Sequence, residues 1–202
     1  MAWLTLGGWV AAMAQERSNI VELTGDAYVN GRRLAPEQTL QTGDQIETGA
    51  ACSLVFVIGD AAFQMRPHTV LTLERGNSLA TVSQLRLQAG AVASVWGASS
   101  RRQIVTPHLS ADFESAGVYA QVSRTRQPHS YLCNCYGTLV LSAGRQNIES
   151  TSAGHEAFWA APESSEGGLL MPADSINHTD KELELLARLL NQKTPWQASG
   201  EK

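Results

Sequence analysis

The sequence predicts an all-β protein that ends in one α-helix. Between residues 19 and 160, short apolar runs are separated by frequent Gly-Asp and Asn-Gly turn signals. Several of these runs alternate apolar and polar residues, as half-buried strands do. After residue 177 the pattern changes to an apolar stripe with helical spacing. We therefore expect stacked β-hairpins, either β-helix-like or jelly-roll-like, closed by a C-terminal helix.

The first 14 residues are typical of a secretory signal peptide. MAWLTLGGWVAAMA is apolar and uncharged, ends in an A-x-A cleavage site, and is followed at once by a polar stretch. No Lys or Arg precedes Arg17, so the usual positive start is missing. Residues 1–14 are predicted to direct export into an oxidising compartment. A packed N-terminal strand or helix is the alternative.

Three runs in the first half of the chain are predicted strands. SLVFVI (53–58) is continuously apolar, which indicates a strand that is buried on both faces. TVLTLE (69–74) and SQLRLQ (83–88) alternate, with leucines on one face and polar side chains on the other.

The middle of the chain predicts a hairpin. VYAQVSR (118–124) and SYLCNCYG (130–137) lie on either side of a polar turn, and GTLVLSAG supplies the next strand.

The C-terminal part is predicted to contain a linker and a helix. Residues 161–177 are rich in Pro, Gly, Ser and Ala, as expected for a linker or loop. A helix is predicted over 178–192, where Thr179 and Glu182 have the spacing of a capping box. Its apolar stripe consists of Leu183, Leu186, Ala187 and Leu190.

Composition excludes several classes of function. The 202 residues are enough for one globular domain, with 43% hydrophobic and 17% charged residues. The net charge is −4 and basic residues are not clustered, which argues against nucleic-acid binding. No run is long enough for a membrane-spanning helix. Enzyme motifs such as G-x-S-x-G, H-E-x-x-H and the P-loop are absent from the sequence, so we do not predict an enzyme.

The C-x-C pair in YLCNCYG has two interpretations. Strand alternation places Cys133 and Cys135 on one face, about 6.6 Å apart at Cα, which disfavours a disulfide between them. A disulfide from Cys52 to either one, or simple burial, would make the pair structural. Alternatively, the two thiolates could bind zinc, iron or a haem iron together with a histidine that folding brings close. The candidate histidines are His155, His178 and His129.

Residues 19–142 resemble the FecR domain. The motifs that carry the resemblance are VNG, LQTGDQIETG, the Gly59-Asp60 turn, and PHTVLTLE, followed by LRLQAGAV and IVTP. One departure is Glu114-Ser115-Ala116-Gly117, which stands where the family usually has R-G-T before a strand. The resemblance implies an exported β-rich module of the bacterial envelope, and therefore a periplasmic location. The best-known members relay an iron-siderophore signal from a receptor to a sigma factor. This sequence resembles their periplasmic module alone, without the cytoplasmic anti-sigma segment or spanning helix.

The last third of the chain resembles a narrower group of FecR-like proteins. These carry a C-x-C-Y-G strand, a histidine-bearing segment and a final N-H-T-D-x-E-L helix. The helix is followed by a Pro-aromatic stop. The matching residues are Cys133 to Gly137, His155-Glu156, Asn177 to Leu183, and Pro195-Trp196. Gly154 stands where a second histidine is expected beside His155.

The sequence thus predicts a non-catalytic, exported FecR-like domain over 19–160, without a cofactor. Its expected role is to bind a protein partner or ligand of the envelope, as a sensor or scaffold. The alternative is a metal- or haem-binding redox protein that uses Cys133, Cys135, His155 and His178.

Overall fold

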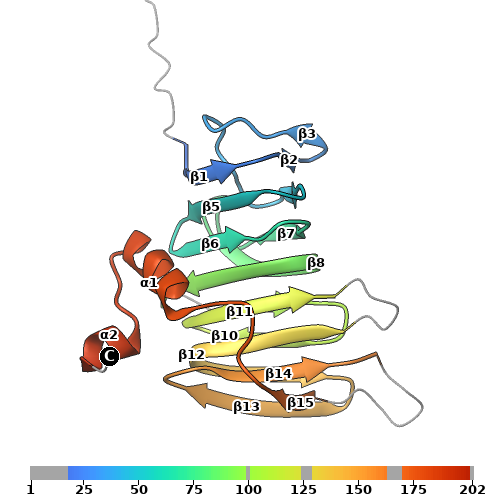
Figure 1. The fold of residues 1–202 in the computed structure, drawn as a ribbon, viewed down its shortest axis with the longest axis vertical. Helices are drawn as coiled ribbons and strands as arrows, with labels where there is room; N and C mark the ends of the chain where they lie inside the picture. The colour runs from blue at the N-terminus through green and yellow to red at the C-terminus, as the bar shows by residue number, and fades with distance from the viewer. Residues whose placement is uncertain (1–17, 99–100, 124–128, 163–169, 201–202) are drawn as a thin grey trace, which may run out of the picture.

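The computed structural model describes residues 18–98, 101–123, 129–162 and 170–200, which form a long β stack followed by two helices (Figure 1). The strands are β1 (Ile20–Thr24), β2 (Ala27–Val29), β3 (Arg32–Arg33), β4 (Gln45–Thr48), β5 (Ser53–Ile58), β6 (Ala61–Met65), β7 (Val70–Arg75), β8 (Val82–Trp96), β9 (Arg102–Val105), β10 (Ser110–Phe113), β11 (Ala116–Val122), β12 (Ser130–Ala143), β13 (Gln146–Ser152), β14 (Glu156–Ala160) and β15 (Leu170–Ala173). The helices are α1 (Asp180–Leu189) and α2 (Pro195–Ser199).

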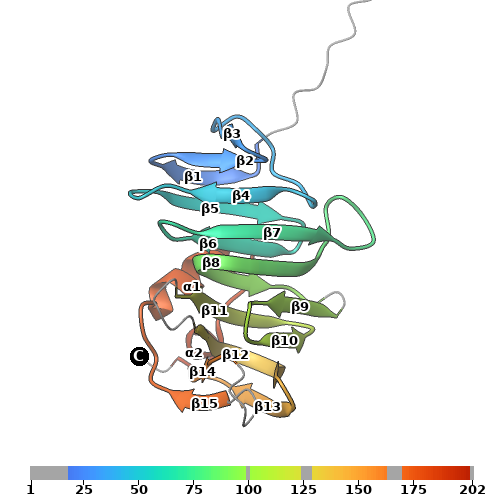
Figure 2. The same ribbon diagram turned by 90° about the vertical axis from the view of Figure 1, so that its right-hand side faces the viewer.

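The strands lie in two layers, which Figures 1 and 2 show from two sides. The helix-side layer has the order β1-β5-β6-β8-β11-β12-β14-β15. The far layer has the order β3-β2-β4-β7-β8-β9-β10-β12-β13. Strands β8 and β12 belong to both layers, so the two layers are joined by continuous backbone.

Each of these two long strands bends at a glycine. The first half of β8 pairs with β7 in the far layer, and the second half pairs with β6 and β11 in the helix-side layer. Strand β8 passes from one layer to the other at Gly90, whose φ is +76°. Strand β12 passes between the layers in the same way at Gly137, whose φ is +107°. Other residues rarely adopt such φ values, which explains why glycine occupies both bends.

The main core lies between the two layers. Its centre is a series of aromatic rings in which neighbouring centroids are 5.0, 5.1 and 5.5 Å apart. These rings are Phe56, Phe63, Trp96 and Phe113. Because Phe113 comes from the far layer and the others from the helix-side layer, the rings help to hold the layers together.

The predicted strand pattern is confirmed. The run 53–58 forms β5, where Leu54 and Phe56 face the core between the layers and Val55 faces α1. Residues 118–122 and 130–137 pair antiparallel as β11 and the first part of β12. The run 83–88 proves to be only the first half of the longer strand β8.

Helix α1 covers the outer face of the helix-side layer. Leu183, Leu186 and Ala187 are buried against β5, β6 and β8 in a second apolar cluster, separate from the main core. The predicted capping box is present, and the backbone N–H of Thr179 donates to Glu182 Oε2 over 2.9 Å.

Two expectations for the C-terminal part need correction. The segment 161–177, expected to be a linker or loop, contains the edge strand β15, which pairs with β14. The chain also forms a second helix, α2, because Thr194 and Gln197 make another capping box and Pro195 begins the helix. The predicted leader, residues 1–14, lies outside the described residues. Neither helix found in the described ranges has the length and apolar character to cross a bilayer.

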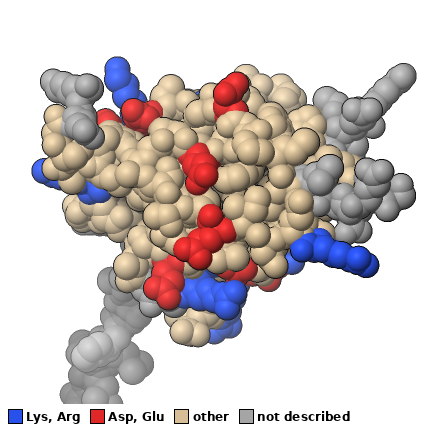
Figure 3. All heavy atoms as spheres, turned by 90° about the horizontal axis from the view of Figure 1, so that it is seen from below, with Lys and Arg blue, Asp and Glu red and all other residues tan. Residues whose placement is uncertain are grey.

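Charged side chains are dispersed at the end of the stack nearest β13. In the view of Figure 3, Asp and Glu lie across the middle of this face, whereas Lys and Arg lie singly or in small groups around its margin. Among the described residues on this face there is no continuous basic patch, in keeping with the acidic net charge of −4.

A β-bulge alters the predicted alternation in β12. Gly117 on β11 is opposite Tyr136, but the next residue, Val118, is opposite Asn134, so Cys135 is an extra residue in its strand. Tyr136 therefore joins the same outer cluster as Cys133 and Cys135, instead of facing the other way with Asn134 as expected. The Tyr136 ring packs directly over Gly117.

We expect Gly117→Ala to destabilise the fold because the new Cβ would lie 2.2 Å from Cε1 of Tyr136. The predicted loss is about 1–3 kcal/mol in the free energy of unfolding, measured by urea denaturation. Gly154→Ala is the matched control, since a Cβ there meets nothing within 4 Å and should change stability by less than about 0.5 kcal/mol. Equal stability of the two variants would contradict the packing assigned to Tyr136.

Candidate metal centre

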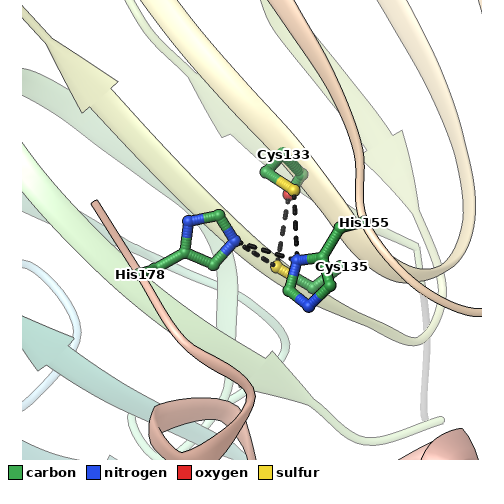
Figure 4. Close-up of side chains that lie close together, drawn as sticks. All are labelled: Cys133, Cys135, His155 and His178. Carbon is green, nitrogen blue, oxygen red and sulfur yellow. Dashed lines mark hydrogen bonds between the residues drawn. The ribbon is translucent and has the colours of Figure 1, made fainter. Parts of the chain in front are cut away.

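Four side chains that could bind a metal converge beside the N-terminal end of α1 (Figure 4). Cys133 and Cys135 come from β12, His155 from the turn between β13 and β14, and His178 from the loop between β15 and α1. One donor atom from each residue lies within 4.8 Å of all the others. The fold thus brings together four of the five candidate ligands named from the sequence, and the fifth, His129, is not among them.

The distances between donor atoms are close to those of a tetrahedral site. Cys133 Sγ lies 3.6 Å from His155 Nδ1, Cys135 Sγ lies 3.4 Å from His178 Nε2, and the two nitrogens are 3.0 Å apart. Ordinary zinc bond lengths place sulfur and nitrogen ligands about 3.6 Å apart and two nitrogen ligands about 3.4 Å apart. The four atoms need only small shifts to surround one ion.

Both imidazole rings are oriented by hydrogen bonds on the side away from the cluster. His178 Nδ1 lies 2.7 Å from the carbonyl oxygen of Ile176, and His155 Nε2 lies 2.7 Å from Asp180 Oδ1. A carbonyl or carboxylate oxygen can only accept, so these ring nitrogens are the donors. The remaining nitrogens, His155 Nδ1 and His178 Nε2, then point their lone pairs into the cluster, an arrangement typical of metal-binding histidines.

The position of His155 is fixed by the bulged strand. Its backbone N–H donates to the carbonyl of Cys135 over 3.1 Å, and its φ of +58° turns the ring toward the cysteines. Asn134 faces inward from the same stretch of β12, and its Nδ2 donates to the carbonyls of Gly137 and Ser150, each over 3.1 Å. These bonds hold β12 against β13 at the bend.

Aromatic rings pack against both histidines. Tyr119 stacks on His178 with centroids 4.6 Å apart, and Trp196 of α2 stacks on His155 at 5.7 Å. Trp196 also contacts Tyr136 edge-on and donates a hydrogen bond from Nε1 to Glu184 over 2.9 Å. The cysteines are fully buried and only 18% of the His155 side chain is exposed, so the cluster is largely shielded from water.

The surroundings shift the pKa values of the two cysteine thiols in opposite directions. The hydrogen bond with Cys135 holds the pKa of Cys133 well below its usual range, with further lowering by His155 and His178. Burial raises the pKa of Cys135. The hydrogen bond to Cys133 raises the pKa of His155 against the opposing effect of burial. These shifts favour a thiolate at Cys133, which is the form in which a cysteine binds a metal ion.

The structure does not support a disulfide to Cys52. All three cysteines of the chain lie in the described ranges, and all three are free. Cys52 belongs to the core between the layers, whereas Cys133 and Cys135 belong to the cluster on the outer face. The sheet itself separates Cys52 from the pair, so the disulfide alternative is wrong. The other candidate ligand, His129, lies instead against Trp159, with centroids 4.5 Å apart.

No role in the site was predicted from the sequence for three residues that contact its histidines: Asp180, Tyr119 and Trp196. Asp180 closely follows His178, which could have indicated a role beside that ligand. An acidic residue in the first turn of a helix is, however, already explained by its favourable interaction with the helix dipole. Tyr119 had no signal, because its approach depends on strand pairing. Trp196 belongs to the Pro-aromatic stop of the narrower resemblance, but its role depends on the unexpected helix α2. Gly154, expected to weaken the site by replacing a histidine, is no obstacle because His178 supplies the fourth donor.

The described fold is similar to that of a candidate anti-sigma factor from Parabacteroides distasonis ATCC 8503. Two crystal structures of that protein match with TM-scores of 0.51 and 0.52, each at 10% sequence identity. The matches cover 72% and 74% of this chain but only 64% and 65% of those chains, which is less than two thirds. At this identity the likeness concerns the fold alone. No protein-family model matches the sequence, and neither does any curated protein.

Proposed function

We propose that this protein binds one zinc ion through Cys133, Cys135, His155 and His178, and that it is a non-catalytic regulatory module of the bacterial envelope. The first part of the proposal comes from the geometry of the site. The second part comes from the FecR-like motifs, the leader-like N-terminus and the fold shared with a candidate anti-sigma factor.

The observation that carries the zinc proposal is the contact between two imidazole nitrogens. His155 Nδ1 and His178 Nε2 are 3.0 Å apart, and each ring donates its only other nitrogen proton outward. Two neutral rings would therefore face each other with their lone pairs, which is unfavourable unless a proton or a cation lies between them. The two sulfurs beside them make a metal cation the better occupant, because the set of two sulfurs and two nitrogens is a common zinc environment.

The ligand set favours zinc over the other candidate groups. Tetrahedral coordination by two sulfurs and two nitrogens suits zinc, whose filled d shell imposes no other geometry. A haem would need a flat pocket with axial ligands on opposite sides of the ring, whereas these four donors converge on one point within 4.8 Å. Four protein ligands also leave no open position for substrate, which supports a structural or regulatory ion over a catalytic one.

The regulatory part of the proposal rests on a partner protein. The neighbouring structures belong to a candidate anti-sigma factor, a class of protein that acts by binding another protein, and the fold is shared over most of this chain. We propose that the envelope partner is a protein and that the β stack is the platform for it. The periplasm is the location that this role requires.

Zinc binding should depend on the cluster cysteines and not on Cys52. Protein refolded with zinc and then desalted should retain about one ion per chain, as measured by elemental analysis. Cys133→Ser and Cys135→Ser should each lose the ion, because the serine hydroxyl is a poor ligand for this site. Cys52→Ala is the control and should retain it, since Cys52 lies in the other cluster.

Cobalt provides a second measurement on the same variants. Cobalt-loaded wild type should have the visible absorption bands of a tetrahedral thiolate site, and both cluster variants should lose them. Wild-type protein that retains no metal would refute the zinc proposal. Protein that instead carries iron, or a haem band that disappears in the Cys133→Ser variant, would favour the redox alternative.

Asp180 should tune the affinity of the site without being a ligand. Its carboxylate accepts the Nε2 proton of His155, so Asp180→Asn should weaken zinc binding by about 10- to 100-fold in competition with a coloured chelator. Asp174→Asn, at an exposed carboxyl group in the same loop, should leave the affinity unchanged. If both variants bound zinc like the wild type, the orienting role of Asp180 would be wrong.

A further inference from the structure

The four ligands of the proposed zinc site come from two parts of the molecule. Cys133, Cys135 and His155 belong to the β stack, whereas His178 is the first residue of what we call the C-terminal arm, residues 178–200 with α1 and α2. Asp180, which orients His155, also belongs to the arm. An ion held by all four ligands therefore joins the arm to the stack.

Apart from the ion, the arm is docked through side chains. Trp196 packs on His155 and Tyr136, and His178 stacks on Tyr119. Helix α1 has 10 residues, too few for a stable helix in water without tertiary contacts. Its buried side chains are Leu183, Leu186 and Ala187, and an ion pair joins Glu182 to Arg66 on the stack. These contacts form a cluster that is separate from the main core, so the arm can detach while the stack stays folded.

The arm ligand is the one that lies in a loop and not in the sheet or one of its hairpin turns. Strand pairing holds the backbone of Cys133, and the hydrogen bond to Cys135 holds that of His155. His178 lies in a loop after Asn177, which has a left-handed φ of +62°. Without a cation, His178 can turn away from the cluster without breaking the backbone hydrogen bond that ties His155 to Cys135.

We propose that the ion is a clasp: its presence keeps the C-terminal arm docked, and its loss releases α1 from the helix-side layer. This inference rests on the zinc site proposed above and adds its regulatory consequence. Release would expose the apolar outer face of the stack, including Val55, Ala62 and Val95, together with the apolar stripe of α1. Metal occupancy would in this way control which surface the protein offers to other molecules.

Hydrogen–deuterium exchange measured by mass spectrometry can test the clasp in the full-length protein. The comparison is between zinc-loaded and zinc-free protein, with the bound zinc measured on each sample by native mass spectrometry. We expect amides in α1, residues 180–189, to exchange at least about tenfold faster in the zinc-free protein. Amides in β5, residues 53–58, should exchange at the same rate in both and so report that the stack remains folded.

Two histidine variants separate the clasp from general stabilisation. In His178→Ala the three stack ligands can still hold zinc, but α1 should exchange fast even in the zinc-loaded state. In His155→Ala the arm ligand remains, and zinc should still slow the exchange of α1 at least about tenfold. Each variant removes one imidazole ligand, but His155→Ala also removes the contacts of His155 with Asp180 and Trp196 of the arm.

The outcomes distinguish this inference from the zinc proposal. Wild type that binds zinc but has equal α1 exchange with and without it would refute the clasp and leave the zinc site standing. Slow α1 exchange in zinc-loaded His178→Ala would refute the role of His178. Fast exchange in zinc-loaded His155→Ala would assign docking to the His155–Asp180 bond instead of the ion. Wild type that takes up no zinc would refute both proposals.

Discussion

Strand β12 belongs to both layers of the β stack, and the geometry of the site depends on how it passes from one layer to the other. The passage occurs at Gly137, directly after the bulge at Cys135. A regular strand would place Tyr136 on the inner face, but the bulge turns it outward beside the two cysteines. The same irregularity frees the Cys135 carbonyl to accept the backbone N–H of His155. One local departure from regular pairing thus shapes the site and ties the next turn to it.

Buried sulfur and imidazole groups are costly unless they find partners, and here each has one. The outward nitrogens bind Ile176 and Asp180, and the rings lie against Tyr119 and Trp196. The inward atoms contact one another, and Cys135 Sγ also lies 3.7 Å from the carbonyl oxygen of Cys133. The outward ring nitrogens thus have hydrogen-bond acceptors, whereas the inward donor atoms are held close together. This contrast distinguishes the cluster from an ordinary buried polar network.

Much of the fold follows from local pattern, because alternation and turn residues act over a few positions. The β class, the β11–β12 pair, the capped helix α1 and the four ligand candidates were all predictable on that basis. The bulge was not, since it arises from the register that β11 imposes on β12. The sequence also could not exclude a disulfide from Cys52, because it does not reveal which side of a sheet a residue near a strand end will occupy. Asp180 and Trp196 join the site only after the arm has docked.

The order of the ligands along the chain has a consequence for biogenesis. Cys135 and His178 are 43 residues apart, and the three strands β13, β14 and β15 must form between them. An unfolded chain therefore offers only the adjacent C-x-C thiols, and the complete tetrahedron exists only after the last strands have paired. The ion would be selected from the metals that are present where folding finishes.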